Sequence, residues 1–326
     1  MRNLALLVLA LFGSLAFAGT ITVTSPSSGD FLGTSNTVNF LITGAVVQVK
    51  VVVTCTLDSN PSISVTVERS FNPNAQGEID NNVPLNFGQS TPEGAYTLTV
   101  VATEPGATYN TPPAIPVNVD VKIPKFGNSN PLSGSFVRDI VPIVVDLDEP
   151  NVKEWRVKIN GGDIPNNSGS TSLISVNWDS NTIVLDGSQT INLTVEDLAR
   201  NTANKDIEVT LDRIKPSSTV LAPSSGTVVR PGSKFSVIIE VLDQFQGSVH
   251  WTGLNVRIET MGGQLIMLVP RKGLNNNGLK LTWTGQVRAG ANLPDEYRIV
   301  VDAVDRAGNV ATQQIINITA SRHGRG

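Results

Sequence analysis

The sequence has few of the residues that build most catalytic and metal centres. Among 326 residues there are one Cys and two His. A single Cys can form neither an intrachain disulfide nor a Cys-ligated zinc or iron–sulfur site. Two His leave little for a His-dependent catalytic cluster, and the sequence contains no G-x-S-x-G or H-E-x-x-H motif. We therefore expect a protein that is not an enzyme and that needs no cofactor.

Charged residues are also sparse, at 16% of the chain, and the net charge is −4. This balance argues against nucleic acid as the main partner. The charge is unevenly distributed. Residues 19–122 carry 3 Lys+Arg against 8 Asp+Glu, residues 123–213 carry 8 against 13, and residues 214–326 carry 12 against 7. An acidic front of −5 and −5 thus precedes a basic end of +5.

Long hydrophobic runs are missing except at the start of the chain. Residues 1–18 read MRNLALLVLALFGSLAFA, in which Arg2 precedes an apolar run and Ala16-Phe17-Ala18 forms a small-residue cleavage site. This order is typical of a secretory signal peptide, and we expect cleavage after Ala18. No later segment is apolar enough to span a bilayer. The mature chain is therefore expected to be secreted, at the cell surface or in the periplasm.

The mature chain repeats itself three times. A Pro followed three residues later by Gly opens each copy, at Pro26, Pro131 and Pro223, so the copies begin 105 and 92 residues apart. Strands with period-two alternation follow in each copy, as in Thr190–Val195, where apolar and polar side chains alternate. Units of about 100 residues built from such strands are typical of immunoglobulin-like sandwiches.

We therefore predict an all-β protein of three tandem immunoglobulin-like β-sandwich domains in a rod. The expected segments are a signal peptide (1–18), domain 1 (19–122), domain 2 (123–213), domain 3 (214–320) and a basic tail (321–326). The links near Lys122–Pro124 and Arg213–Pro216 are short and contain Pro, which restricts hinge motion. Three such domains in line would extend on the order of 100 Å.

The end of the third copy, WTGQVRAGANLPDEYRIVVDAVDRAGN at residues 283–309, resembles the Ig-like domains of bacterial extracellular proteins, including the Ig-like domain of flagellar hook-capping proteins. The matching positions are Trp283, Gly285, Asp295, Tyr297, Asp305, Ala307, Gly308 and Asn309. The second copy keeps a looser version (Trp178, Asp197, Ala199 and Asn201), and the first reads TEPG at residues 103–106 instead. The resemblance implies a fold and says little about a role.

The residues of this motif also have a structural interpretation. Asp305 is expected to accept hydrogen bonds from turn amides, with Gly308 and Asn309 adopting or tolerating positive φ. Tyr297 and Trp155 are expected to fill domain cores, and Cys55, within an alternating strand, to be a buried core residue.

One acidic segment is a candidate calcium site. Asp146, Asp148 and Glu149 lie together at the end of a predicted strand, and hard oxygen ligands suit Ca²⁺. The full D-x-[DN]-x-[DN]-G loop is absent, so a solvated acidic loop is the alternative interpretation. Asp197 and Asn201 are expected near a different pole.

The basic residues of the third copy are a candidate partner-binding surface. Five of them are singled out: Arg271, Lys272, Lys280, Arg288 and Arg298. Complementary charge would let them contact an anionic envelope polymer, a cell-envelope protein, or the acidic front of another copy of the chain. The alternative is that these charges only keep the protein soluble.

The leading functional hypothesis is a secreted or cell-surface, non-enzymatic structural or adhesion protein of bacterial type that binds an envelope or extracellular partner. Two alternatives stay open. One is an accessory module that binds a carbohydrate or a protein ligand, and the other is a structural subunit or cap of an envelope assembly.

Overall fold

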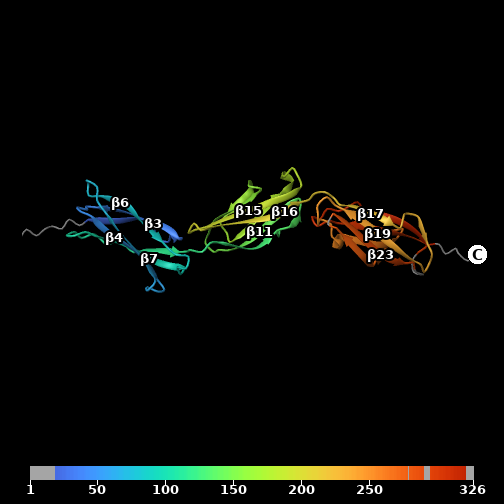
Figure 1. The fold of residues 1–326 in the computed structure, drawn as a ribbon, viewed down its shortest axis with the longest axis horizontal. Helices are drawn as coiled ribbons and strands as arrows, with labels where there is room; N and C mark the ends of the chain where they lie inside the picture. Colours follow the sequence, from blue (N-terminus) through green and yellow to red (C-terminus); the bar gives the residue numbers. More distant parts are fainter. Residues whose placement is uncertain (1–18, 278, 290–293, 321–326) are drawn as a thin grey trace, which may run out of the picture.

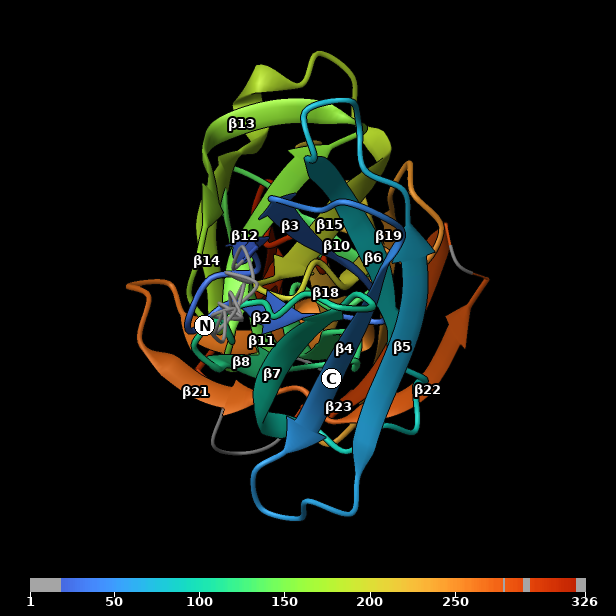
Figure 2. The ribbon, with the colours of Figure 1, turned by 90° about the vertical axis from the view of Figure 1, so that its left-hand side faces the viewer.

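A computed structural model describes residues 19–277, 279–289 and 294–320. They form three all-β sandwiches joined end to end, so that the molecule is a rod with the N-terminal domain at one end and the C-terminal domain at the other (Figure 1). Seen along the rod, the sandwiches lie one behind another (Figure 2). The predicted signal peptide and the basic tail at 321–326 lie outside the described residues.

Domain 1 packs a three-stranded sheet, in the order β1-β3-β6, against a five-stranded sheet, in the order β2-β8-β7-β4-β5. Its strands are β1 (Thr20–Ser25), β2 (Phe31–Leu32), β3 (Ser35–Thr43), β4 (Val49–Leu57), β5 (Ser64–Phe71), β6 (Ile79–Asn86), β7 (Gly94–Thr103) and β8 (Ile115–Val119).

Domain 2 has the sheets β14-β11-β9 and β10-β16-β15-β12-β13. Its strands are β9 (Lys125–Asn130), β10 (Ser135–Val137), β11 (Ile140–Asp148), β12 (Val152–Ile159), β13 (Gly162–Gly169), β14 (Leu173–Asp179), β15 (Gly187–Asp197) and β16 (Thr202–Leu211). A short 3₁₀ turn, η1 (Ser180–Thr182), follows β14.

Domain 3 has the sheets β17-β19-β23-β22 and β18-β25-β24-β20-β21. Its strands are β17 (Ser217–Ala222), β18 (Thr227–Val229), β19 (Lys234–Leu242), β20 (Leu254–Thr260), β21 (Leu265–Leu268), β22 (Arg271–Asn276), β23 (Lys280–Arg288), β24 (Glu296–Ala303) and β25 (Gln314–Ala320). A second 3₁₀ turn, η2 (Trp251–Gly253), precedes β20.

The Pro and Gly that open each repeat mark the point where the chain changes sheets. Pro26, Pro131 and Pro223 follow cis peptide bonds. The Gly three positions later has φ near +80 to +90° in every copy, a conformation that Gly adopts without steric cost. The chain then enters a short strand that pairs in parallel with the last strand of the domain, in β2–β8, β10–β16 and β18–β25. The three copies therefore share one topology, to which domain 3 adds the edge strand β22.

Each domain has its own hydrophobic core, because alternate residues of the strands point inward from both sheets. In β4 every second residue from Val49 to Leu57 is buried. The predicted core positions Trp155 and Tyr297 are buried in domains 2 and 3. The three clusters of buried apolar residues share no member. The domains are therefore separate packing units.

Cys55 lies in the core of domain 1, as predicted, and is fully buried. Burial raises the pKa of its thiol to about 12, so almost no thiolate exists at neutral pH. We expect a maleimide reagent to leave the folded protein unlabelled and to label one thiol per chain in denaturant. Rapid labelling in native buffer, followed by mass spectrometry, would contradict this burial.

The described part of the chain contains no regular helix beyond the two 3₁₀ turns. A search of the same residues for a helix of sufficient length and hydropathy to cross a bilayer finds none.

Candidate cation sites at the domain junctions

Each linker between domains begins with an aspartate that is fixed to the domain before it. Asp120 follows β8, and its backbone N–H donates to Leu32 O at 3.0 Å. Asp212 follows β16, and its N–H donates to Val137 O at the same distance. In both cases the short strand β2 or β10 supplies the acceptor. The two aspartates therefore occupy equivalent positions.

The next domain meets this aspartate with the loop that follows its β15 or β24 strand. Within the loop Asp197 accepts hydrogen bonds from Asn201 N and Nδ2, at 2.8 and 2.9 Å. The same Nδ2 donates across the junction to Asp120 O at 3.0 Å. The D-x-x-x-N spacing thus folds a loop whose last side chain contacts the preceding domain.

The second junction repeats this arrangement. Asp305 accepts from Asn309 N and Nδ2, both at 2.8 Å, and Asn309 Nδ2 donates to Asp212 O at 2.9 Å. Asn309 was expected to tolerate positive φ, but the turn places other residues in that conformation. Gly308 has φ +88°, and Arg200 takes the equivalent place in domain 2 with φ +69°. Asn309 instead bridges two domains.

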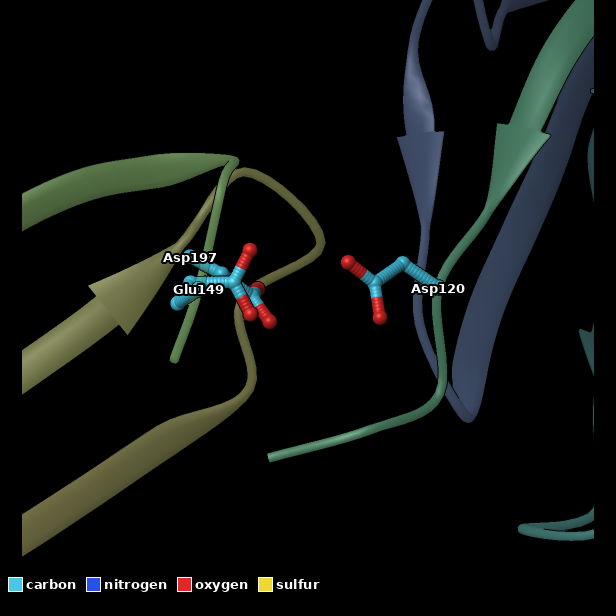
Figure 3. Close-up of side chains that lie close together, drawn as sticks. All are labelled: Asp120, Glu149 and Asp197. Carbon is cyan, nitrogen blue, oxygen red and sulfur yellow. The ribbon is translucent and has the colours of Figure 1, made fainter. Parts of the chain in front are cut away.

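A third carboxylate completes a cluster at each junction. Glu149 directly follows β11, and Asp243 directly follows β19. Asp120 reaches from domain 1 toward Glu149 and Asp197 on domain 2 (Figure 3). One carboxylate oxygen from each of these three lies within 4.8 Å of the others, and the same holds for Asp212, Asp243 and Asp305.

A neutral polar residue lies beside each cluster. Asn151 N donates to Glu149 Oε1 at 2.7 Å, and the Asn151 side chain bonds Asp120. At the second junction the buried Ser248 takes this place. Its hydroxyl lies 2.7 Å from Asp212 Oδ2 and 3.1 Å from Asp243 Oδ2. A hydroxyl has only one proton, so it cannot donate to both carboxylates at once.

Five of these six carboxylates are buried, and Asp243 is half-buried. The exposed fractions of Asp120, Glu149 and Asp197 are 8%, 6% and 0%. No ion pair between described residues includes any of the six acids of the two clusters. Buried carboxylates without a counter-charge destabilise a fold unless a cation or protons neutralise them.

Burial raises the pKa values of several carboxyl groups in the two clusters. Burial raises the pKa of Asp120, and the neighbouring Asp197 carboxylate raises it further. Burial is also the main cause of the raised pKa of Glu149. At the second junction burial raises the pKa of both Asp212 and Asp243. Each cluster therefore binds protons more readily than isolated carboxylates do.

The donor set fits a hard divalent cation. All the side-chain ligands are oxygens, with no His or Cys among them. Calcium binds oxygens at about 2.3–2.6 Å, so oxygens on one ion can lie up to roughly 5 Å apart, as these do. A cleft of about 530 Å³, lined in part by Asp120, Lys122 and Glu149, opens beside the first cluster. Calcium also tolerates the irregular geometry that a junction between two domains provides.

Of the three acids that were predicted to bind calcium, the structure brings only one into a junction cluster. Glu149 belongs to the first cluster, but Asp146 and Asp148 are exposed on β11 and belong to neither cluster. Asp197 and Asn201 were placed near a different pole, which is wrong, because they lie at the same junction as Glu149.

The linker aspartates were not singled out from the sequence, although a signal exists. Both linkers share the spacing Asp-x-x-x-Pro, in DVKIP at residues 120–124 and DRIKP at residues 212–216. The partners of these aspartates lie 29 to 93 residues further along the chain, so no local pattern joins them to the rest of a cluster.

The opposite pole of domain 1 is built differently. Glu104 is buried there, but Tyr109 Oη donates to it at 2.5 Å and the amides of Val46 and Val47 donate at 3.0 and 2.7 Å. These hydrogen bonds outweigh burial and lower the pKa of Glu104. Among the described residues, clusters of three acids occur only at the two junctions.

Of the five basic residues predicted to bind a partner, four lie on the neighbouring strands β22 and β23 of one sheet, and Arg298 lies on the other sheet. Arg298 lies on β24 and pairs with Glu259 at 2.7 Å, while Lys280 lies on β23, in the other sheet, and pairs with Glu240. Arg288 donates to Gly232 O at 3.5 Å. Arg271 and Lys272 are exposed at the start of the edge strand β22. Two opposite faces of the sandwich thus share these charges.

Comparison with known proteins adds only fold similarity. No family model and no curated protein sequence matches the chain. Among solved structures, the fibronectin(III)-like modules of Clostridium thermocellum CbhA match with 13% identity and a TM-score of 0.43, covering 63% of this chain and 100% of that one. A Ca²⁺-stabilised adhesin of an Antarctic bacterium matches with 17% identity and a TM-score of 0.32, covering 94% and 74%. The hook-capping resemblance stays a prediction from the sequence.

Proposed function

We propose that the protein is a non-enzymatic extracellular scaffold or adhesion rod in which calcium ions at the two junctions fix the orientation of neighbouring immunoglobulin-like domains. In this proposal Asp120, Glu149 and Asp197 hold one ion. Asp212, Asp243 and Asp305 hold the other. The ions would neutralise the buried carboxylates and connect two domains through shared ligands.

The observation that carries the proposal is the recurrence of one arrangement at both junctions. Each cluster takes its first acid from the linker, its second from the end of β11 or β19, and its third from a D-x-x-x-N loop. A solvated acidic loop requires neither the burial of its carboxylates nor the repetition of one geometry at two junctions. A rod that keeps its shape is suited to presenting a surface away from its point of attachment.

The test is a calorimetric titration of the chain, freed of metal by chelator, with CaCl₂ at neutral pH. We expect two ions per chain, with dissociation constants in the 10⁻⁴–10⁻³ M range of extracellular modules or tighter. Glu149→Gln should remove one ion and Asp243→Asn the other. Asp146→Asn, a change in an exposed acid on β11, the strand that Glu149 directly follows, is the matched control.

Absence of binding heat together with an unchanged melting temperature would contradict the calcium proposal. Loss of binding in the Asp146→Asn control would place the ion elsewhere. Magnesium at equal concentration should bind more weakly, since it requires near-ideal octahedral geometry.

A further inference from the structure

We infer that the two junctions differ in stiffness, with the first acting as the hinge of the rod and the second held by direct protein contacts. The inference goes beyond the proposed function, because it concerns contacts between side chains and backbone that exist without any cation. Two differences between the junctions support it.

The first difference concerns the residue after the short strand that opens each domain. Leu32 and Val137 are equivalent, since both accept the linker aspartate amide, so Gly33 and Arg138 are equivalent as well. Arg138 Nε donates across the second junction to Ala307 O at 2.9 Å. Gly33 faces the corresponding carbonyl, that of Ala199, and has no side chain with which to bond it.

Gly33 nevertheless lies close to that carbonyl. A Cβ built on Gly33 would come within 2.5 Å of Ala199 O. The first junction therefore has room at this point only for a backbone contact. Gly33 N–H donates within its own domain, to Asn36 Oδ1. The hydrogen bond that Arg138 makes across the second junction has no counterpart here.

The second difference concerns the basic residue of each linker. Arg213 Nε donates to Asp186 Oδ1 at 2.6 Å and its backbone N donates to Asp186 Oδ2 at 2.8 Å. The Arg213 and Asp186 side chains are 27% and 12% exposed. In the first linker Lys122, one position further along than Arg213, pairs with Glu93 through its backbone N and its side chain, but the Lys122 side chain is 72% exposed. An exposed lysine pair restrains a linker less than a partly buried arginine pair does.

Open space does not distinguish the junctions, because each borders a cleft. The cleft at the first junction is the one of about 530 Å³ described above, and the cleft at the second, of about 450 Å³, is lined in part by Phe136, Arg138 and Ala307. The hydrogen bond of Arg138 and the less exposed ion pair of Arg213 are therefore the contacts that hold the second junction more firmly and leave domain 1 freer to rotate against the other two domains.

The experiment measures distances between spin labels in a chelator, so that its outcome does not depend on calcium. Cys55 is replaced by Ser, and labels are attached through Ser70→Cys, Ser172→Cys and Ser236→Cys, one exposed site per domain. The pair 70/172 reports the first junction and the pair 172/236 the second. We expect the 70/172 distance distribution to be clearly broader.

The variant Arg138→Ala tests whether the hydrogen bond from Arg138 to Ala307 O stiffens the second junction. Arg138→Ala should broaden the 172/236 distribution and leave 70/172 unchanged. The control is Arg156→Ala, which removes an exposed ion pair with Glu154 on the same domain and should change neither distribution. Equal widths for the two pairs in the parent protein, or a 172/236 distribution that does not respond to Arg138→Ala, would overturn the inference.

Discussion

Replacing Glu149 by Gln is expected to stabilise the cation-free protein and at the same time to abolish its stabilisation by calcium at the first junction. Gln keeps the oxygen that accepts from Asn151 N but removes one of three buried negative charges. Without a cation the loss of charge relieves repulsion with Asp120 and Asp197. With calcium present, it removes a ligand. For an ion at 100 times its dissociation constant, the stabilisation lost is about 2.7 kcal/mol.

In chelator, the free energy of unfolding should decrease as the pH rises, because the buried carboxylates become charged. The folded-state pKa values of Asp120 and Glu149 are raised by burial, as are those of Asp212 and Asp243. The folded chain then binds more protons than the unfolded chain between the ordinary carboxyl range and these raised values. Stability contributed by the clusters is therefore present at acid pH and is lost as the pH rises through the raised values.

Thermal unfolding in chelator and in calcium, from pH 5 to pH 8, checks both expectations. The stabilising effect of calcium should grow with pH, because protons and calcium compete for the same oxygens. Asp148→Asn, which removes the exposed charge next to Glu149, is the control and should leave the calcium response intact. A Glu149→Gln protein that is less stable in chelator and still responds fully to calcium would contradict the assignment.

Truncating Trp178 to Ala should destabilise domain 2 by about 3–5 kcal/mol, the range found when large buried aromatic side chains are removed. The Trp178 side chain is 1% exposed and lies on β14 within the core of domain 2. Because the three cores share no residue, the main effect should fall on a single unfolding transition. Differential scanning calorimetry in chelator separates the transitions.

Leu173→Ala is the matched control for this prediction. Leu173 lies on the same strand, but its side chain points outward and is 45% exposed. Its removal should change stability by no more than about 0.5 kcal/mol. If Trp178→Ala shifted all three transitions by the same amount in chelator, the domains would not be the independent folding units that their separate cores imply.

The architecture could be predicted from the sequence because its signals are local. Period-two alternation identified strands such as Thr190–Val195, which lies within β15. The Pro and Gly at each opening identified the repeat, since both residues are required by a backbone feature that recurs in every domain.

The candidate site could be predicted only in part, for a physical reason. Glu149 was selected because it lies in an acidic segment. Asp120 has no acidic neighbour in the sequence and joins a cluster only through its contacts with the domain that follows it. The relative orientation of two domains is set by contacts such as Asn201 Nδ2 to Asp120 O. Periodicity within one strand holds no information about such contacts.

The basic residues of domain 3 illustrate the same limit. Lys280 and Arg298 lie in the same basic segment of the sequence, yet their strands, β23 and β24, belong to different sheets of the sandwich. Net charge by segment describes the long-range field of a domain, while a binding surface depends on which side chains share a face and which are already paired.

The position of Asp120 and Asp212 at the start of each linker has a mechanical consequence. The linker is the only covalent connection between neighbouring domains, so tension applied along the rod must pass through it. A cation bound to the linker aspartate and to the loops of the next domain would add a second connection in parallel with the chain. Pulling experiments on single molecules should therefore show a rod that lengthens at lower force in chelator than in calcium.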